Sequence, residues 1–367
     1  MTDPATPAGN VPDPVDWPTA RRVARVVGGR DPLSLSYLGT SLDRDFTALT
    51  EEAEGYVADF TGLRGPGRAT AAVLDRGGWV DANVESMRRL LAPLTQRLGE
   101  RLASSAIAPL GRIVTGTEVG VLLGYLSQRV LGQYDLLVPE GASGDAVYYV
   151  GPNVLGLEKR FAFRPRDFRL WIAIHEVTHR AQFTGVPWLK SYFLSLVDKT
   201  LNIVEPDPRT LLDAMRRAGD ELRRGRNPLD DGGIVGLFAS REQRGVLDQV
   251  QALMSLLEGH GNFVMSELGR RHVAGEERMA RILHTRRQAS GLNSVVQKLL
   301  GFEMKMRQYD VGERFIRAVT DEAGLGVLDA AWQGPEALPT LEELRVPSQW
   351  LTRVGASSPA ARATGTA

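Results

Sequence analysis

Apolar residues recur at helical spacing along most of the chain, and this pattern predicts a mainly α-helical protein. The expected helices lie at about residues 16–28, 42–62, 80–106, 116–131, 167–184, 188–203, 207–225, 240–269, 275–288, 291–321 (with a break near Gly301) and 323–332. Strands are few, and the best candidates are residues 135–138 and 146–150. The segment PEGASGD between them contains glycine and can close a hairpin. We therefore expect a helical domain with a small β-hairpin or sheet.

The two ends of the chain differ from the rest in composition. Residues 1–14 and 354–367 are rich in Pro, Gly, Ala, Ser and Thr, which predicts disorder. Residues 15–353 carry the helical pattern and no internal repeat, so we expect them to form a single domain.

The helix expected over 167–184 contains the pentad His-Glu-Val-Thr-His, in the run DFRLWIAIHEVTHRAQF. Histidines at i and i+4 lie on one helical face, so His175 and His179 can both reach a metal ion at about 2.0–2.1 Å. Glu176 lies about 100° around the helix, too far to be a ligand but well placed to act as general base on a water. Apolar residues on both sides of the pentad predict a buried helix. The alternative is two core histidines bonded to backbone carbonyls, with Glu176 on the surface.

A catalytic zinc ion usually takes three protein ligands, so the pentad requires one more. The metzincin motif needs glycine at position 182 and histidine at position 185, but Gln182 and Gly185 stand there, which excludes that class. Asp198 and Glu258 are the acidic candidates downstream. Helical angles favour Glu258, because apolar or small residues fall within about 60° of it: Leu247, Met254, Gly261 and Met265. Asp198, or a core salt bridge for Glu258, stays open.

The residues beside Glu258 are unusual for a helix interior. Gly259 and Gly261 each cost about 1 kcal/mol relative to alanine, which is expected if another backbone or a substrate passes close. His260 falls about 200° from Glu258, so it cannot share a metal ion with it on an unbroken helix. We expect His260 behind the ligands or at the surface.

Composition narrows the chemistry further. The chain has no cysteine, which excludes disulfides and thiolate zinc sites and leaves His, Asp and Glu as strong ligands. Basic and acidic residues number 44 each, and no basic stripe with aromatics occurs, so we expect no nucleic-acid partner. The N-terminal residues do not read as a signal peptide, and no stretch of 18 uninterrupted apolar residues occurs. We therefore expect a cytoplasmic protein with no membrane partner, and the sequence leaves its oligomeric state open.

Several ordered motifs resemble a known family. They are WIAIHEVTHRAQF followed by PWL, then LLEGHGNFVM, GFEMKMRQYDVGERF and LPTLEEL. This combination, over about residues 15–352, resembles a bacterial zincin-like family of zinc-dependent hydrolases, and most of all its branch associated with biosynthesis of the deazaflavin coenzyme. The resemblance implies a mainly helical zincin-like fold with zinc on His175, His179 and Glu258. It implies no particular substrate.

These features predict a zinc hydrolase of the peptidase kind that acts on a peptide or small amide, with Glu176 as general base. Tyr309 and His272 are the candidates for a donor to the oxyanion. Zinc peptidases hold substrate backbones by strand addition, and residues 147–150 are the strand expected to do so here, unless the hairpin only caps the core. The alternative function is a catalytically inactive, zinc-stabilised helical scaffold or partner-binding protein. Such a scaffold would have no use for Glu176.

Overall fold

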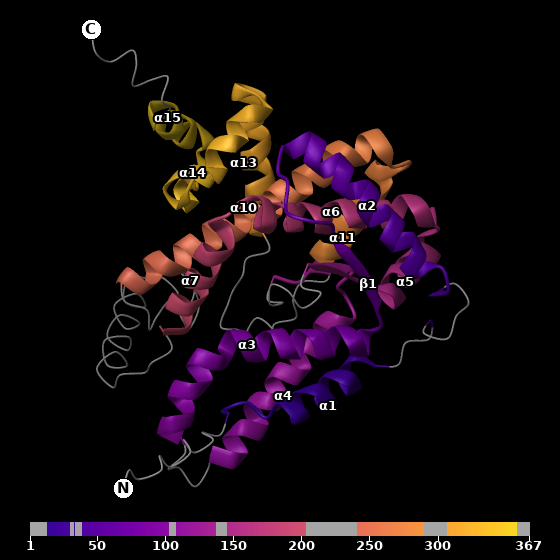
Figure 1. The fold of residues 1–367 in the computed structure, drawn as a ribbon, viewed down its shortest axis with the longest axis vertical. Helices are drawn as coiled ribbons and strands as arrows, with labels where there is room; N and C mark the ends of the chain where they lie inside the picture. Colours follow the sequence, from indigo (N-terminus) through magenta and orange to yellow (C-terminus); the bar gives the residue numbers. More distant parts are fainter. Residues whose placement is uncertain are drawn as a thin grey trace, which may run out of the picture. The chain divides into compact units, whose positions relative to one another are not determined.

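The structure, a computed structural model, describes residues 13–29, 33, 39–102, 108–136, 145–202, 241–289 and 307–357. It is mainly helical with one small sheet, which confirms the predicted fold class (Figure 1). The helix predicted over 207–225 and the first half of that predicted over 291–321 lie outside the described residues. So does most of both termini predicted to be disordered, although residues 13 and 14 and the start of the C-terminal segment are described.

Contacts between residues group the chain into two compact units. The first comprises Met1–Gly39, Leu74–Leu131 and Val150–Asn153, and the second comprises Thr40–Val73, Gly132–Tyr149 and Val154–Ala367. A single domain over residues 15–353 stays a prediction. All residues predicted to carry the chemistry belong to the second unit.

The first unit is built on α1 (Trp17–Gly28), α3 (Arg76–Leu102) and α4 (Ala108–Ser127). The α4 helix begins eight residues earlier than predicted, and its glycines serve close packing. A Cβ at Gly116, Gly120 or Gly124 would come within 2.4, 2.6 and 2.6 Å of backbone oxygens of α1 or its N-cap. These glycines, spaced four residues apart, therefore let the two helix backbones touch side by side (Figure 1).

The second unit contains α2 (Leu42–Thr61), α6 (Pro165–Gly185) and α10 (Arg241–His272), which pack against one another. The remaining helices are α7 (Leu189–Asn202), α11 (Glu276–Ala289), α13 (Arg307–Ala323), η2 (Leu325–Trp332), η3 (Pro335–Ala337), α14 (Leu341–Arg345) and α15 (Pro347–Ser357). The sequence pattern missed α14, although Thr340 and Glu343 form a capping box at its start. It also missed α15 and α5 (Gly151–Phe161), which directly follows a strand.

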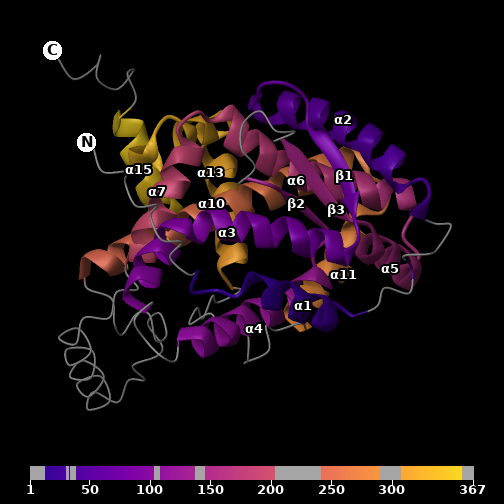
Figure 2. The ribbon, with the colours of Figure 1, turned by 60° about the horizontal axis from the view of Figure 1, so that its bottom comes forward.

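The sheet has three strands, β1 (Thr70–Leu74), β2 (Gly132–Tyr134) and β3 (Ala146–Val150), in the order β1-β3-β2 (Figure 2). Strands β2 and β3 pair antiparallel, with Gly132 opposite Tyr149, as a hairpin requires. The strand predicted at 135–138 is wrong for residues 135 and 136, because the pairing ends at Tyr134 and only the Asp135 N–H continues it, to Ala146 O at 3.1 Å; residues 137 and 138 lie outside the described part of the chain. Strand β3 is central and has a partner strand on both sides, so the expected addition of a substrate strand to residues 147–150 is also wrong. The strand that packs against α6 is β2.

Two buried arginines fasten α6 to its neighbours. Arg169 lies 2.6 Å from Asp45 of α2, and Arg180 lies 2.6 Å from Glu54 of the same helix. Arg180 Nε also donates to Asp145 Oδ2 at 2.7 Å, just before β3. Breaking a buried pair costs about 3–5 kcal/mol because it leaves a charge without its partner. The pentad therefore lies on a helix that is held at both ends.

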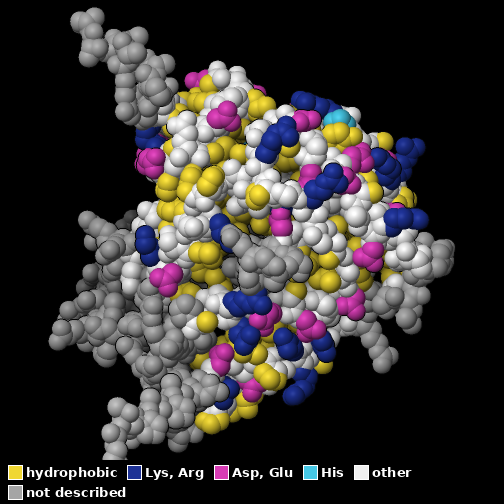
Figure 3. Space-filling model, in the orientation of Figure 1, with side chains coloured by type: hydrophobic (Ala, Val, Ile, Leu, Met, Phe, Trp, Pro, Cys, Tyr) yellow, Lys and Arg dark blue, Asp and Glu magenta, His cyan; other side chains and the backbone are white. Residues whose placement is uncertain are grey.

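The surface carries both signs of charge. On the face drawn in Figure 3, basic and acidic side chains of the described residues are interspersed. The formal net charge of the whole chain is zero. Among the described residues, no helix is long and apolar enough to cross a lipid bilayer.

Candidate metal centre

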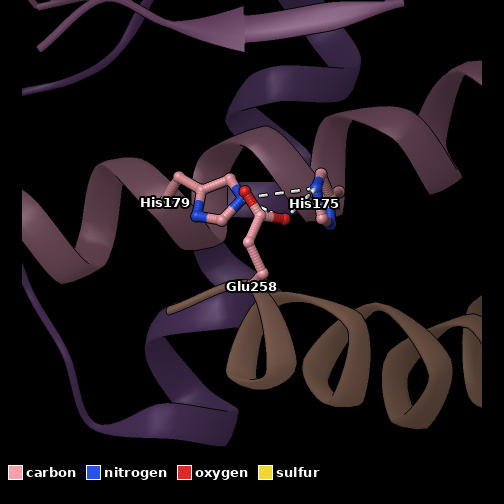
Figure 4. Close-up of side chains that lie close together, drawn as sticks. All are labelled: His175, His179 and Glu258. Carbon is pink, nitrogen blue, oxygen red and sulfur yellow. Dashed lines mark hydrogen bonds and ion pairs between the residues drawn. The ribbon is translucent and has the colours of Figure 1, made fainter. Parts of the chain in front are cut away.

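Three side chains from two helices meet at one point. His175 and His179 extend from α6, and Glu258 extends from α10 towards both of them (Figure 4). The Nε2 atoms of the two histidines lie 3.2 Å apart, and Glu258 Oε2 lies 3.9 Å from that of His175 and 3.8 Å from that of His179. The three ligand atoms lie within 4.8 Å of one another. The structure thus brings together all three predicted ligands.

The spacing of these atoms fits a zinc ion. Ligands at about 2.0–2.1 Å in a tetrahedron lie about 3.3–3.4 Å from one another. The observed separations of 3.2, 3.8 and 3.9 Å are within about 0.6 Å of that value. The side chains of His175, His179 and Glu258 are 15%, 14% and 24% exposed, so the group is neither sealed in the core nor open on the surface. A catalytic site needs this partial access, because water and substrate have to reach the metal.

The position of Glu258 depends on two glycines that follow it along α10, Gly259 and Gly261. A Cβ at Gly259 would lie 2.3 Å from the backbone of Gly312, so α10 and α13 cross here in direct backbone contact. This confirms that another backbone passes close to Gly259. A Cβ at Gly261 would lie 3.2 Å from the His179 ring and 3.3 Å from the His175 ring. The close neighbours of Gly261 are thus the two histidine rings themselves.

Glu176 is buried on α6 and is not one of the three grouped ligands. Its carboxylate lies against the backbone of Gly132 at the start of β2. A Cβ at Gly132 would come within 2.5 Å of Glu176 Cγ and 2.8 Å of its Oε1. The alternative of a surface Glu176 is therefore wrong. The absence of a side chain at Gly132 leaves room for this carboxylate.

His179 makes a further contact on the side of its ring away from the metal position. Its Nδ1 lies 2.9 Å from Gln182 Oε1, and Gln182 Nε2 lies 2.9 Å from His260 Nδ1. His260 is therefore placed behind the ligands, one of the two locations expected for it, and only 2% of its surface is exposed. Burial, with a smaller contribution from nearby His179, lowers the pKa of His260 to about 3, so the ring is neutral at pH 7.

The other candidates lie elsewhere. Asp198 is exposed on α7 and does not belong to the grouped ligands. His272 is exposed, stacks on Tyr56 with ring centroids 3.8 Å apart, and follows Glu258 by 14 residues, about 21 Å of helix. The backbone of Tyr309 belongs to α13, but its side chain lies outside the described part of the structure.

Two residues that contact the candidate site were not predicted. Gln182 follows His179 by three residues, a spacing that places the two side chains side by side on a helix and could have been noticed. Gly132 could not, because its contact with Glu176 joins segments 44 residues apart and depends on the register of the hairpin.

Comparison with known proteins agrees with this geometry. The sequence model of the zincin-like metallopeptidase family matches residues 15–351. A crystal structure from Chloroflexus aurantiacus, described as a candidate hydrolase with a novel fold, shares 30% sequence identity with the chain. It superposes with a TM-score of 0.70 over 93% of this chain and 99% of that chain. Comparison with curated proteins gives no match. Because the family match runs through nearly the whole chain and includes both helices of the metal centre, the chain belongs to the zincin-like metallopeptidase family.

Proposed function

We propose that the chain is a zinc-dependent hydrolase that cleaves a peptide or other amide bond, with His175, His179 and Glu258 holding the metal. The observation that carries this proposal is the His-His-Glu group with a second, buried carboxylate, that of Glu176, on the residue after His175. Two histidines and a glutamate are the ligand set of catalytic zinc in several peptidases, whereas structural zinc sites usually have four protein ligands. Membership of the zincin-like metallopeptidase family supports the same reading.

Zinc bound by these residues would supply Lewis-acid chemistry, acidifying water and polarising a carbonyl group. The two histidines have to present unprotonated Nε2 atoms, and Glu258 contributes the negative charge that a divalent cation prefers. Glu258 is 24% exposed, so its carboxylate has access to solvent before metal binds.

Glu176 is the proposed general base. Its carboxylate oxygen would accept a proton from the attacking water and later deliver a proton to the leaving nitrogen of the amide. Such positioned proton transfer contributes about 10²–10⁴-fold to the rate. Two observations support this role. Glu176 is buried and lies against Gly132, and it is the residue that directly follows the ligand His175.

Tyr309 is proposed as the donor to the oxyanion. Its backbone precedes Gly312 by three residues on α13, and Gly312 contacts Gly259, next to Glu258. This places Tyr309 about 4.5 Å along α13 from the point where that helix crosses α10. A tyrosine hydroxyl that donates to the substrate oxygen would stabilise the negative charge that develops there.

The scaffold alternative predicts different chemistry. A zinc-stabilised scaffold needs His175, His179 and Glu258, but it has no use for a buried carboxylate that is not a metal ligand. The buried Glu176 and the clearance left by Gly132 therefore favour the hydrolase. A cytoplasmic location, the absence of a nucleic-acid partner and membership of the deazaflavin-associated branch stay predictions from the sequence.

The test compares wild type with Glu176→Gln on one peptide library, with the zinc content of both proteins measured. The amide is nearly isosteric with the carboxylate but cannot take the proton, so the variant is expected to keep zinc and lose cleavage. Asp198→Asn is the matched control, because it neutralises an exposed carboxylate on α7 and is expected to change neither property. Equal cleavage by wild type and Glu176→Gln would refute the role of Glu176. No cleavage by zinc-loaded wild type would favour the scaffold.

A further inference from the structure

The side-chain amide of Gln182 joins the metal centre to the helix behind it. Gln182 is fully buried on α6, and its Oε1 lies 2.9 Å from His179 Nδ1. Its Nε2 donates to the backbone oxygen of Leu257 at 3.0 Å and lies 2.9 Å from His260 Nδ1. One amide thus contacts a proposed metal ligand on α6 and two groups on α10.

The Leu257 carbonyl determines which way this amide is oriented. A carbonyl oxygen can only accept a hydrogen bond, so the amide atom that faces Leu257 has to be the nitrogen. The oxygen of Gln182 must then face His179, and because this oxygen also only accepts, His179 Nδ1 has to carry the hydrogen. A neutral imidazole with hydrogen on Nδ1 has its lone pair on Nε2. Nε2 is the atom that faces His175 and Glu258.

His260 completes the arrangement. The second hydrogen of the Gln182 amide points to His260 Nδ1, which therefore has to accept. A hydrogen on that nitrogen would face the amide hydrogens and push the amide out of this orientation. The ring is held from another side by Trp332 of η2, with ring centroids 5.2 Å apart in an edge-on contact. Both partners of the Gln182 nitrogen are therefore acceptors, which prevents the amide from turning over.

We propose that Gln182 is a positioning residue that holds His179, before any metal binds, in the tautomer whose Nε2 lone pair points at the metal position. The Leu257 carbonyl and His260 hold Gln182 in turn. This inference rests on the proposed function only in taking His179 as a metal ligand. Without Gln182 the His179 ring could place its hydrogen on Nε2, and this hydrogen would have to be displaced before zinc could bind. Removing such a supporting hydrogen bond typically weakens metal affinity by about 10–100-fold.

Two measurements test the proposal on wild type, Gln182→Met and Gln182→Glu. The first is the ¹⁵N NMR spectrum of the metal-free protein, which reports which imidazole nitrogen of His179 carries hydrogen. The second is the Kd for Zn²⁺, measured by competition with a chelator at a temperature where every protein is folded. Wild type is expected to show hydrogen on Nδ1. Gln182→Met is expected to lose that signature and to bind zinc about 10–100-fold more weakly.

The glutamate variant separates positioning from packing. A carboxylate at this position can still accept from His179 Nδ1 but cannot donate to the Leu257 carbonyl or to His260, so Gln182→Glu is expected to keep the hydrogen on His179 Nδ1 while lowering the Tm. Asn153→Leu is the matched control, because Asn153 is also a buried amide that donates to two backbone oxygens, those of Ser127 and Val130. This control is expected to lower the Tm and leave the Kd for zinc unchanged.

The outcomes distinguish this proposal from the proposed function. Hydrogen on Nε2 of His179 in metal-free wild type would overturn the positioning role whether or not the protein is an enzyme, and this result needs no variant to fold. Wild-type affinity in Gln182→Met, or loss of the hydrogen from His179 Nδ1 in folded Gln182→Glu, would overturn it as well. If wild type bound no zinc, the proposed function would fail, while the spectrum would still decide the tautomer.

Discussion

Replacing Gly132 with alanine adds one methyl group directly against the proposed base. The new Cβ would lie 2.5 Å from Glu176 Cγ and 2.9 Å from its Cδ. Ordinary contacts between carbon atoms are about 3.5–4.0 Å, so the Glu176 side chain has to move by about 1 Å or more. Gly132 is not among the described glycines with positive φ, so alanine can adopt its backbone conformation without strain. The change therefore displaces the base while leaving the strand itself intact.

A displacement of about 1 Å in a catalytic group can cost about 100-fold in rate. We expect Gly132→Ala to reduce kcat/KM on any peptide substrate found in the library by about that factor, with zinc content unchanged. The Tm should change little, because the displaced atoms belong to a side chain that can rotate, and alanine gains about 0.4–1 kcal/mol by restricting the unfolded chain. Gly156→Ala on α5 is the matched control. A Cβ there meets nothing within 4 Å, so activity should stay at the wild-type level.

The double variant Gly132→Ala/Glu176→Gln tests whether Gly132 acts through Glu176. If it does, the double variant should be no slower than Glu176→Gln alone, because the base has already been removed. Two results would refute the conclusion that the space beside Gly132 holds the catalytic carboxylate. One is a loss of activity in the double variant equal to the product of the two single losses, and the other is full activity in Gly132→Ala.

Three further predictions follow from the contacts around the site. Glu258→Ala should abolish stoichiometric zinc binding in metal analysis while Asp198→Ala keeps it, and the reverse result would transfer the third ligand to α7. Gly312→Ala should lower the Tm by several degrees and weaken zinc binding, because its Cβ would overlap the backbone oxygen of Ser255 and overpacking costs about 1–3 kcal/mol; an unchanged Tm would contradict this. Burial raises the pKa of Glu276, so its contribution to stability is present at low pH and is lost as the pH rises through the raised pKa. The Tm of Glu276→Gln should therefore rise relative to that of wild type as the pH increases from 4 to 8. Parallel curves of Tm against pH would count against the reasoning.

The metal-binding histidine pair could be predicted because it depends only on local geometry. Once the run around the pentad forms a helix, the i and i+4 spacing places His175 and His179 on the same face. Local geometry alone does not determine the third ligand, because helical angles show only which face Glu258 occupies and not what lies opposite. That face meets α6, and next to Glu258 the same helix crosses α13 in backbone contact at Gly259 and Gly312, which are 53 residues apart. A contact over such a separation leaves no periodic signal in the chain.

The errors in secondary structure have a similar cause. The predicted start of α4 is eight residues late, and Gly116, Gly120 and Gly124 within the helix let α1 approach, so tertiary packing outweighs their low helix propensity. The first strand of the hairpin was expected at 135–138 because Leu136, Leu137 and Val138 are apolar. The pairing instead uses Gly132–Tyr134, where the less apolar residues lie. A strand of three residues is too short for its alternation to be recognised.

The candidate site depends as much on missing side chains as on those present. Gly132 leaves room for the Glu176 carboxylate, Gly261 leaves room for both histidine rings, and Gly312 lets α13 approach the helix that carries Glu258. At Gly132 and Gly312 a single Cβ would come closer than 3.0 Å to other atoms, and at Gly261 the clearance is only 3.2 Å. A Cβ at Gly261 would crowd the two rings without overlapping them. Gly261→Ala should therefore leave the Tm nearly unchanged and raise the Kd for zinc. A fall in Tm with an unchanged Kd for zinc would show instead that the histidine rings can move away from α10 without losing the metal.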